Sequence, residues 1–167
     1  MELNLESFKL YTRETPVQIL TEDYPSRDWP ISGGWGYTQE DAVVIETENG
    51  QLGVTLEYEF LKYRTYEEMI VFRPKEDRFA GFRFEKYMQF LVSSGEGSNE
   101  RHFDNVIIKV TCFKEKDFNM LRENWIAHNG YVGDEEGKKA HMQLHESKMI
   151  TFEIIGWFDI TKFFGNY

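Results

Sequence analysis

Two stretches in the second half of the chain alternate between apolar and polar side chains, and this pattern constrains the fold more than any other feature. Apolar residues occupy every second position over 106–112 and again over 150–160, where Gly156 completes the row. A third run of the same kind begins at 82–88. A period of two places these side chains on one face of an extended strand. The sequence therefore predicts a sheet that packs one face against a core.

Further elements are expected on either side of these strands. A hairpin is predicted over 42–60, because β-branched and alternating residues flank an Asn49-Gly50 turn. A short strand is expected at 17–21, and 61–73 fits either a capped helix or a buried strand. One helix is indicated at about 116–128 by residues spaced three and four apart. Its apolar stripe consists of Phe118, Leu121, Trp125 and His128.

These elements together predict an α+β fold that is rich in strands. We expect about eight strands, in a largely antiparallel curved sheet or an open barrel, because hairpin connections dominate. One main helix, at about 116–128, would pack on this sheet. The length of 167 residues suits a single domain over 1–167.

The charge balance limits the classes of partner. The chain has 29 Asp and Glu against 19 Lys and Arg, a formal net charge of −10. Such a chain is repelled by phosphate backbones and anionic membrane surfaces, which argues against direct nucleic-acid binding. The negative charge indicates either a surface that binds a basic protein partner or one that serves solubility alone. A single cysteine, no basic leader and no apolar run of membrane-spanning length predict a cytoplasmic protein outside the membrane. The oligomeric state stays open.

A glycine-rich segment at 31–37 suggests where a partner would bind. It lacks the lysine of a phosphate-binding loop, so it fits either a tight turn that packs aromatic rings or a binding loop. Glu57 and Glu59 would add acidic groups from one face of a strand. We therefore predict a small acidic binding protein of the inhibitor or immunity type, without cofactor or catalytic residues. Its predicted partner-binding residues are Trp29, Trp35, Tyr37, Glu57 and Glu59.

A histidine cluster supports an alternative function. His128, His141 and His145 lie within a short stretch, and the spacing of the last two is i, i+4. On a helix these two rings share a face and bind one metal, whereas on a strand they lie ~13 Å apart. The segment 134–147 fits both structures. The alternative is an enzyme or ligand carrier whose histidine-centred site, with or without a divalent transition metal, lies in the concavity of the sheet.

Cys112 is the one thiol of the chain. It shares the apolar face of the 106–112 strand, so we expect a buried small hydrophobe with a raised pKa rather than a nucleophile.

Overall fold

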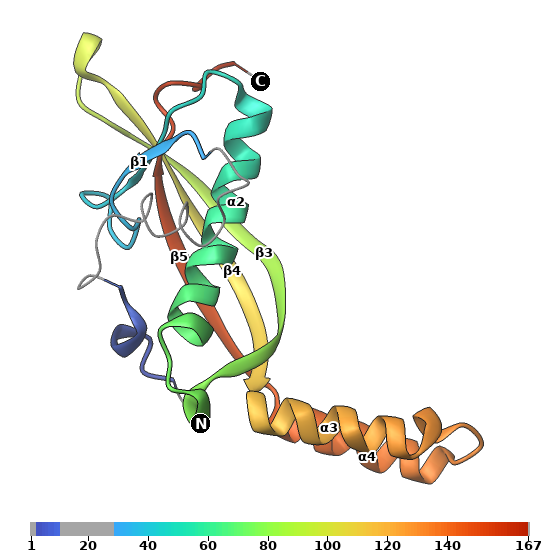
Figure 1. Cartoon of the computed structure of the whole chain (residues 1–167). Helices are drawn as coiled ribbons and strands as arrows, with labels where there is room; N and C mark the ends of the chain where they lie inside the picture. The colour runs from blue at the N-terminus through green and yellow to red at the C-terminus, as the bar shows by residue number, and fades with distance from the viewer. Residues whose placement is uncertain (1–2, 11–28, 167) are drawn as a thin grey trace.

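A computed structural model describes residues 3–10 and 29–166. The fold is α+β, with a five-stranded mixed sheet in the order β1-β2-β5-β4-β3 (Figure 1). The strands are β1 (Ile31–Gly33), β2 (Val43–Ile45), β3 (Phe79–Ser94), β4 (Arg101–Lys114) and β5 (Ile150–Asp159). The α-helices of the described residues are α2 (Gly50–Tyr66), α3 (Glu115–Ala127) and α4 (Glu135–Lys148).

The three long strands confirm the alternating pattern. β4 lies between β3 and β5 and pairs antiparallel with both. Its residues Val106, Ile108, Val110 and Cys112 are at most 2% exposed; the first three belong to the same core cluster as α2, and Cys112 packs in a second cluster with Phe8, Met69 and Phe79. β2 pairs parallel with β5, at Val43↔Phe158 and Val44↔Asp159, so the sheet is mixed. Five strands, rather than eight, form the described sheet, and it does not close into a barrel.

The predicted hairpin over 42–60 is wrong in its second half. Residues 54–60 belong to α2, which begins after Asn49 and continues as the π-helical turn η2 (Glu67–Val71). The Asn49 side chain accepts a hydrogen bond from the Leu52 N–H at 2.9 Å, so the expected turn residue is a helix N-cap. The buried positions of α2 recur every three or four residues. They include Gly53, Leu56, Glu57, Phe60, Leu61 and Arg64.

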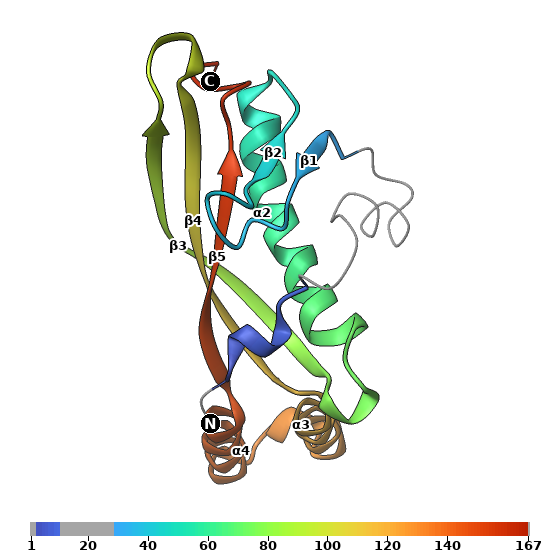
Figure 2. The ribbon, with the colours of Figure 1, turned by 90° about the vertical axis from the view of Figure 1, so that its left-hand side faces the viewer.

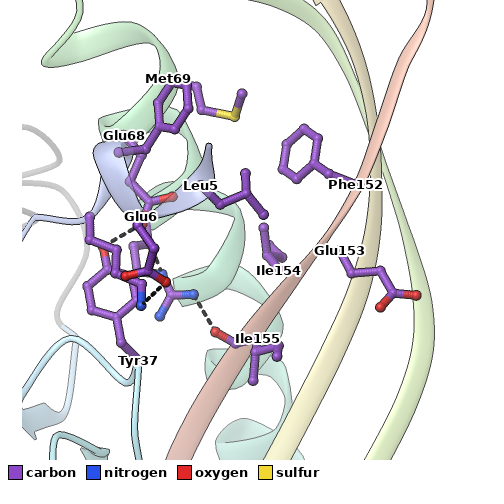
Figure 3. Close-up of a pocket in the computed structure, with 12 residues that line it drawn as sticks. Leu5, Glu6, Tyr37, Glu68, Met69, Phe152, Glu153, Ile154 and Ile155 are labelled. Atoms are coloured by element: carbon purple, nitrogen blue, oxygen red, sulfur yellow. Dashed lines mark hydrogen bonds and ion pairs between the residues drawn. The ribbon is translucent and has the colours of Figure 1, made fainter. Parts of the chain in front are cut away.

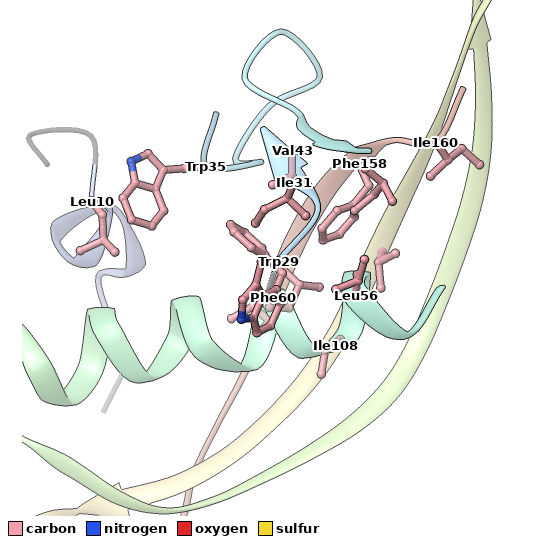
Figure 4. Packing of buried hydrophobic residues seen from close by; sticks show 14 of the residues in the cluster. Leu10, Trp29, Ile31, Trp35, Val43, Leu56, Phe60, Ile108, Phe158 and Ile160 are labelled. Atoms are coloured by element: carbon pink, nitrogen blue, oxygen red, sulfur yellow. The ribbon is translucent and has the colours of Figure 1, made fainter. Parts of the chain in front are cut away.

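Close contact between α2 and the sheet depends on two glycines. A Cβ at Gly53 would lie 2.3 Å from Cε1 of Phe163, and one at Gly156 would lie 2.5 Å from Cδ2 of Leu61. The missing side chains therefore let the helix approach β5 and the C-terminal turn. Between α2 and β5, the rings of Phe60 and Phe158 pack edge-to-face, with ring centroids 5.9 Å apart (Figure 4).

Two parts of the chain extend away from this core. The first, which we call the arm, consists of α3, the turn η5 (Asn129–Tyr131) and α4, and it leaves the lower end of β4 and β5 (Figures 1 and 2). The second, the outer hairpin (87–103), begins within the sheet, where 88–92 pair with β4 residues that also pair with β5, and its tip (93–102) extends beyond the opposite end of β5. The predicted helix at about 116–128 is confirmed as α3.

The segment 134–147 proves to be helical. Asp134 caps α4 by accepting a hydrogen bond from the Gly137 N–H at 2.9 Å, which places Gly137 in the first turn of the helix. Leu5–Phe8 form a short 3₁₀ turn, η1, beside the lower half of β5 (Figure 2). The strand expected at 17–21 lies outside the described residues. None of the described helices is long and apolar enough to cross a membrane.

Candidate functional site

A groove lies between η1, the end of α2 with η2, and the edge of β5, and we call it the β5 groove (Figure 3). It encloses about 160 Å³. Ligand pockets usually measure roughly 300–1,000 Å³, so this volume suits one or two side chains better than a cofactor. Its apolar lining is Leu5, Phe8, Met69, Phe152, Ile154 and Ile155, and its polar lining is Glu6, Lys9, Tyr37, Arg64, Glu68 and Glu153.

Arg64 closes one end of the β5 groove. Its side chain is buried, and it donates hydrogen bonds to the carbonyl oxygens of Trp35 at 2.7 Å and Ile155 at 2.5 Å. Its Nε lies 3.6 Å from Oε1 of Glu68, one helical turn further along the chain. The guanidinium group therefore occupies the place of a neighbouring strand beside Ile155 and neutralises a buried carboxylate.

Tyr37 forms the wall next to Arg64. Its hydroxyl donates to Glu68 and accepts a hydrogen bond from the Leu10 N–H at 3.0 Å, while the Arg64 guanidinium lies 4.4 Å from the ring centroid. Burial, and then the negative charge of Glu68, raise the pKa of Tyr37. Burial also raises the pKa of Glu68, although the charge of Arg64 opposes this. Because Arg64 and Tyr37 both bind Glu68, this wall of the groove is fixed in place.

The structure places the other predicted partner-binding residues away from any shared surface. Trp29 and Trp35 are 5% and 4% exposed and belong to the core. Glu57 is fully buried and Glu59 is half-buried, two positions apart on α2 rather than on one face of a strand. Of the predicted set, Tyr37 alone lines the β5 groove. The structure contradicts two premises of this prediction, a strand over 54–60 and exposed tryptophans, whereas the binding role itself stays a prediction.

Glu57 instead belongs to a buried pair of carboxyl groups. Burial, together with the neighbouring charge of Asp104 on β4, raises the pKa of Glu57 to about 9. Burial also raises the pKa of Asp104, whose Oδ2 accepts a hydrogen bond from Nε2 of Gln89 at 2.6 Å. Gln89 in turn accepts from Lys86 at 2.9 Å and from the Tyr58 hydroxyl at 3.2 Å. At neutral pH the pair holds a proton, and its contacts join α2 to β3 and β4.

The three histidines of the alternative hypothesis lie on the arm, outside any concavity of the sheet. His128 stacks on Tyr131 with ring centroids 4.7 Å apart, and His141 packs between Tyr131 and Trp125. His145 packs against Phe113 at the base of the arm, 4.8 Å between centroids. Within residues 3–10 and 29–166, no group of three or more His, Cys, Asp or Glu side chains is placed to hold a metal ion. The aromatic contacts explain these histidines as packing residues of the arm.

Cys112 is fully buried, as its face of β4 predicted. Burial raises the pKa of the thiol to about 12, so the reactive thiolate is scarce at neutral pH.

The glycine-rich segment consists of β1 (Ile31–Gly33) and the first residues of the connection to β2. Gly33 and Gly36 have φ of +82° and +73°, which glycine adopts without strain. The carbonyl oxygen of Gly36 accepts a hydrogen bond from the Trp157 N–H at 2.9 Å. The tight-turn interpretation therefore fits this geometry, and the turn packs against β5.

Exposed apolar side chains concentrate on the arm and on the outer hairpin. On the arm, Val132 is 82% and Ile126 65% exposed, although both are β-branched residues that usually lie inside proteins. On the outer hairpin, Tyr87 and Leu91 are each 54% exposed. Further exposed apolar residues are Trp125 and Met142 on the arm, and Met88 and Phe90 on the outer hairpin.

Searches of protein-family models, of curated proteins and of solved structures find no significant match to this chain. The assignment of function therefore depends on the geometry and charge described above.

Proposed function

We propose that the chain is an acidic protein-binding protein, of the kind that inhibitors and immunity proteins represent, and that its partner is a basic protein of the cytoplasm. The observation that carries the proposal is the concentration of exposed apolar side chains on the arm and the outer hairpin. The arm extends beyond the core, and the hairpin residues lie on the edge strand β3, outside the buried clusters, so these side chains add little to the core. Exposed apolar groups of this kind mark interaction surfaces.

The charge of the chain supports a basic partner. A net charge of −10 attracts basic surfaces from a distance and speeds their association, whereas apolar contacts supply the affinity after encounter. The single, buried cysteine is compatible with the reducing cytoplasm.

The test is capture of the partner from the cells that make this protein, using the wild-type chain and matched variants. The double variant Ile126→Ala/Val132→Ala removes the arm's most exposed apolar groups, and Leu91→Ala does so on the outer hairpin. Gln143→Ala is the control, because it truncates an exposed polar residue of α4. We expect at least one apolar variant to weaken binding by about tenfold or more, as truncation of a central interface residue does.

Salt provides the second measurement. Raising the salt concentration from about 0.1 M to about 0.5 M should weaken a steered, charge-complementary complex, because screening shortens the electrostatic range. Equal recovery of the bound protein by all three variants, with no dependence on salt, would contradict the proposal.

A further inference from the structure

β5 has an edge that is only partly used. On one side it pairs with β4 along its whole length, from Cys112↔Ile150 to Phe103↔Asp159. On the other side it pairs with β2 only at Phe158 and Asp159. Towards the arm, the rest of this edge forms one side of the β5 groove.

The direction of the backbone groups on this edge follows from two hydrogen bonds. The Trp157 N–H donates to Gly36, and the Ile155 carbonyl accepts from Arg64, both on the side away from β4. Because backbone groups alternate in direction along a strand in an antiparallel ladder, Glu153 points its N–H and C=O the same way. In the described part of the chain, no backbone or side-chain hydrogen bond reaches the backbone of Glu153.

The side chains around this edge define what would fit. Phe152 and Ile154 face the apolar side chains of η1 and η2, so a segment in the groove meets apolar contacts. The exposed charges nearby are acidic: the Glu6 side chain is 75% exposed, and Glu153, which points away from the groove to the other face of the sheet, is exposed without an ion pair among the described residues (Figure 3). Lys9 already pairs with Glu6 at 2.7 Å, and Arg64 is buried against Glu68.

We propose that the β5 groove receives an extended segment of the protein partner, which adds as a strand to β5 beside Glu153. Strand addition supplies backbone hydrogen bonds, and alternate side chains supply specificity. The segment places one or two apolar side chains in the groove, in keeping with its volume, and alternates them with Lys or Arg, which lie near Glu153 on the other face of the sheet. This inference rests on the proposed function, because it names where and how the partner binds.

The sharpest variant removes one backbone donor. Glu153→Pro deletes the N–H that the added strand would use, at a position where that N–H faces away from β4, so the ladder of the sheet keeps its hydrogen bonds. Glu153→Val is the matched control, since it removes the same charge and keeps the N–H. Equal circular dichroism spectra and thermal midpoints would show that both variants fold.

The probe is a set of peptides selected from a random display library on the wild-type chain. We expect the selected peptides to alternate apolar and basic residues. We also expect Glu153→Pro to weaken their binding at least about tenfold, and Glu153→Val to weaken it less, by the loss of one negative charge beside the added strand. If Glu153→Pro does not fold, exchange of the Glu153 amide in the wild type replaces it: a bound peptide should protect this amide.

Several results would overturn the inference. The inference fails if peptides bind Glu153→Pro and Glu153→Val equally well. It also fails if the selection yields no alternating sequence, or if a bound peptide does not protect the Glu153 amide. A wild-type chain that dimerises through this edge, and a Glu153→Pro chain that does not, would assign the groove to a second copy instead. Loss of the native partner in Ile126→Ala/Val132→Ala but not in Glu153→Pro would reject strand addition and leave the proposed function standing.

Discussion

The edge of β3 and the lower edge of β5 offer backbone groups to other chains in different ways. β3 is a long edge strand whose register with β4 shifts at Ala80/Arg83 and at Lys86/Met88. Bulges of this kind hinder the pairing of edge strands between molecules. β5, by contrast, pairs with β4 without a register shift, and its open edge lies inside a groove. β3 is therefore suited to contacts through its side chains, whereas β5 is suited to selective contacts through its backbone.

The largest effect should come from the residue that closes the β5 groove. Arg64→Met leaves the carbonyl oxygens of Trp35 and Ile155 and the carboxylate of Glu68 without their buried cation. We expect the free energy of unfolding to fall by about 3–5 kcal/mol, the usual effect of breaking a buried ion pair. Denaturant unfolding monitored by tryptophan fluorescence measures it.

Arg83→Met on β3 is the matched control for that prediction. Its side chain is 76% exposed and pairs with Glu85. Exposed pairs contribute about 0–1 kcal/mol, so this variant should unfold almost as the wild type does. Equal destabilisation by the two substitutions would remove the energetic distinction between the two edges.

The second effect concerns the attachment of β3 to α2 and depends on pH. The pKa of Glu57 rises from its ordinary value of 4.5 to about 9 in the folded protein. Below pH 4.5 both the folded and unfolded states are protonated, whereas between pH 4.5 and 9 the unfolded state alone loses the proton. Stability from this group is therefore greatest in acid and falls as the pH rises to about 9.

Glu57→Gln tests this linkage, because glutamine is neutral at every pH. We expect the thermal midpoint of the variant, relative to that of the wild type, to increase as the pH is raised through the neutral range. Glu59→Gln, two positions along α2 and half-buried, is the control, and its difference from the wild type should depend less on pH. A pH-independent difference for Glu57→Gln would show that the carboxyl pair does not hold a proton.

The smallest effect concerns the wall of the β5 groove. Tyr37→Phe removes the hydroxyl that binds Glu68 and the Leu10 N–H. Loss of a partner from a buried group costs about 1–3 kcal/mol, and denaturant unfolding measures it. Tyr58→Phe removes a hydroxyl that donates to Gln89 of β3 at 3.2 Å, and should lower the free energy of unfolding by about 0.5–1.5 kcal/mol. A larger effect of Tyr58→Phe would mean that the β3 side depends more on its hydrogen bonds than the groove does.

The parts of the fold that sequence predicts are those that local patterns specify. The alternation at Val106 and Ile108 predicts β4, and the spacing of Phe118 and Leu121 predicts α3, because each pattern matches one period. α2 shows both periods: Val54, Leu56, Tyr58 and Phe60 alternate, yet the helix buries positions three and four apart. The N-cap Asn49 is a local signal for the start of this helix, but the same residue also suits a hairpin turn.

The candidate site was less accessible to sequence analysis because its contacts join distant segments. Arg64 bonds the carbonyl oxygen of Ile155, 91 positions away, and Glu57 meets Asp104 from another element. No local period encodes such contacts. The exposed residues of the arm, such as Ile126 and Val132, also escape a pattern argument, because an apolar residue usually predicts burial.

Hydrogen exchange at single amides of β5 tests the central claim most directly, because neighbouring amides point to opposite sides of the strand. The Ile154 N–H faces β4 in the ladder, whereas the Glu153 N–H faces the β5 groove. In the isolated protein we predict that the Glu153 amide exchanges at least about 100-fold faster than that of Ile154. Equal, strong protection of both amides would show that this edge is already paired, and would contradict a free site for strand addition.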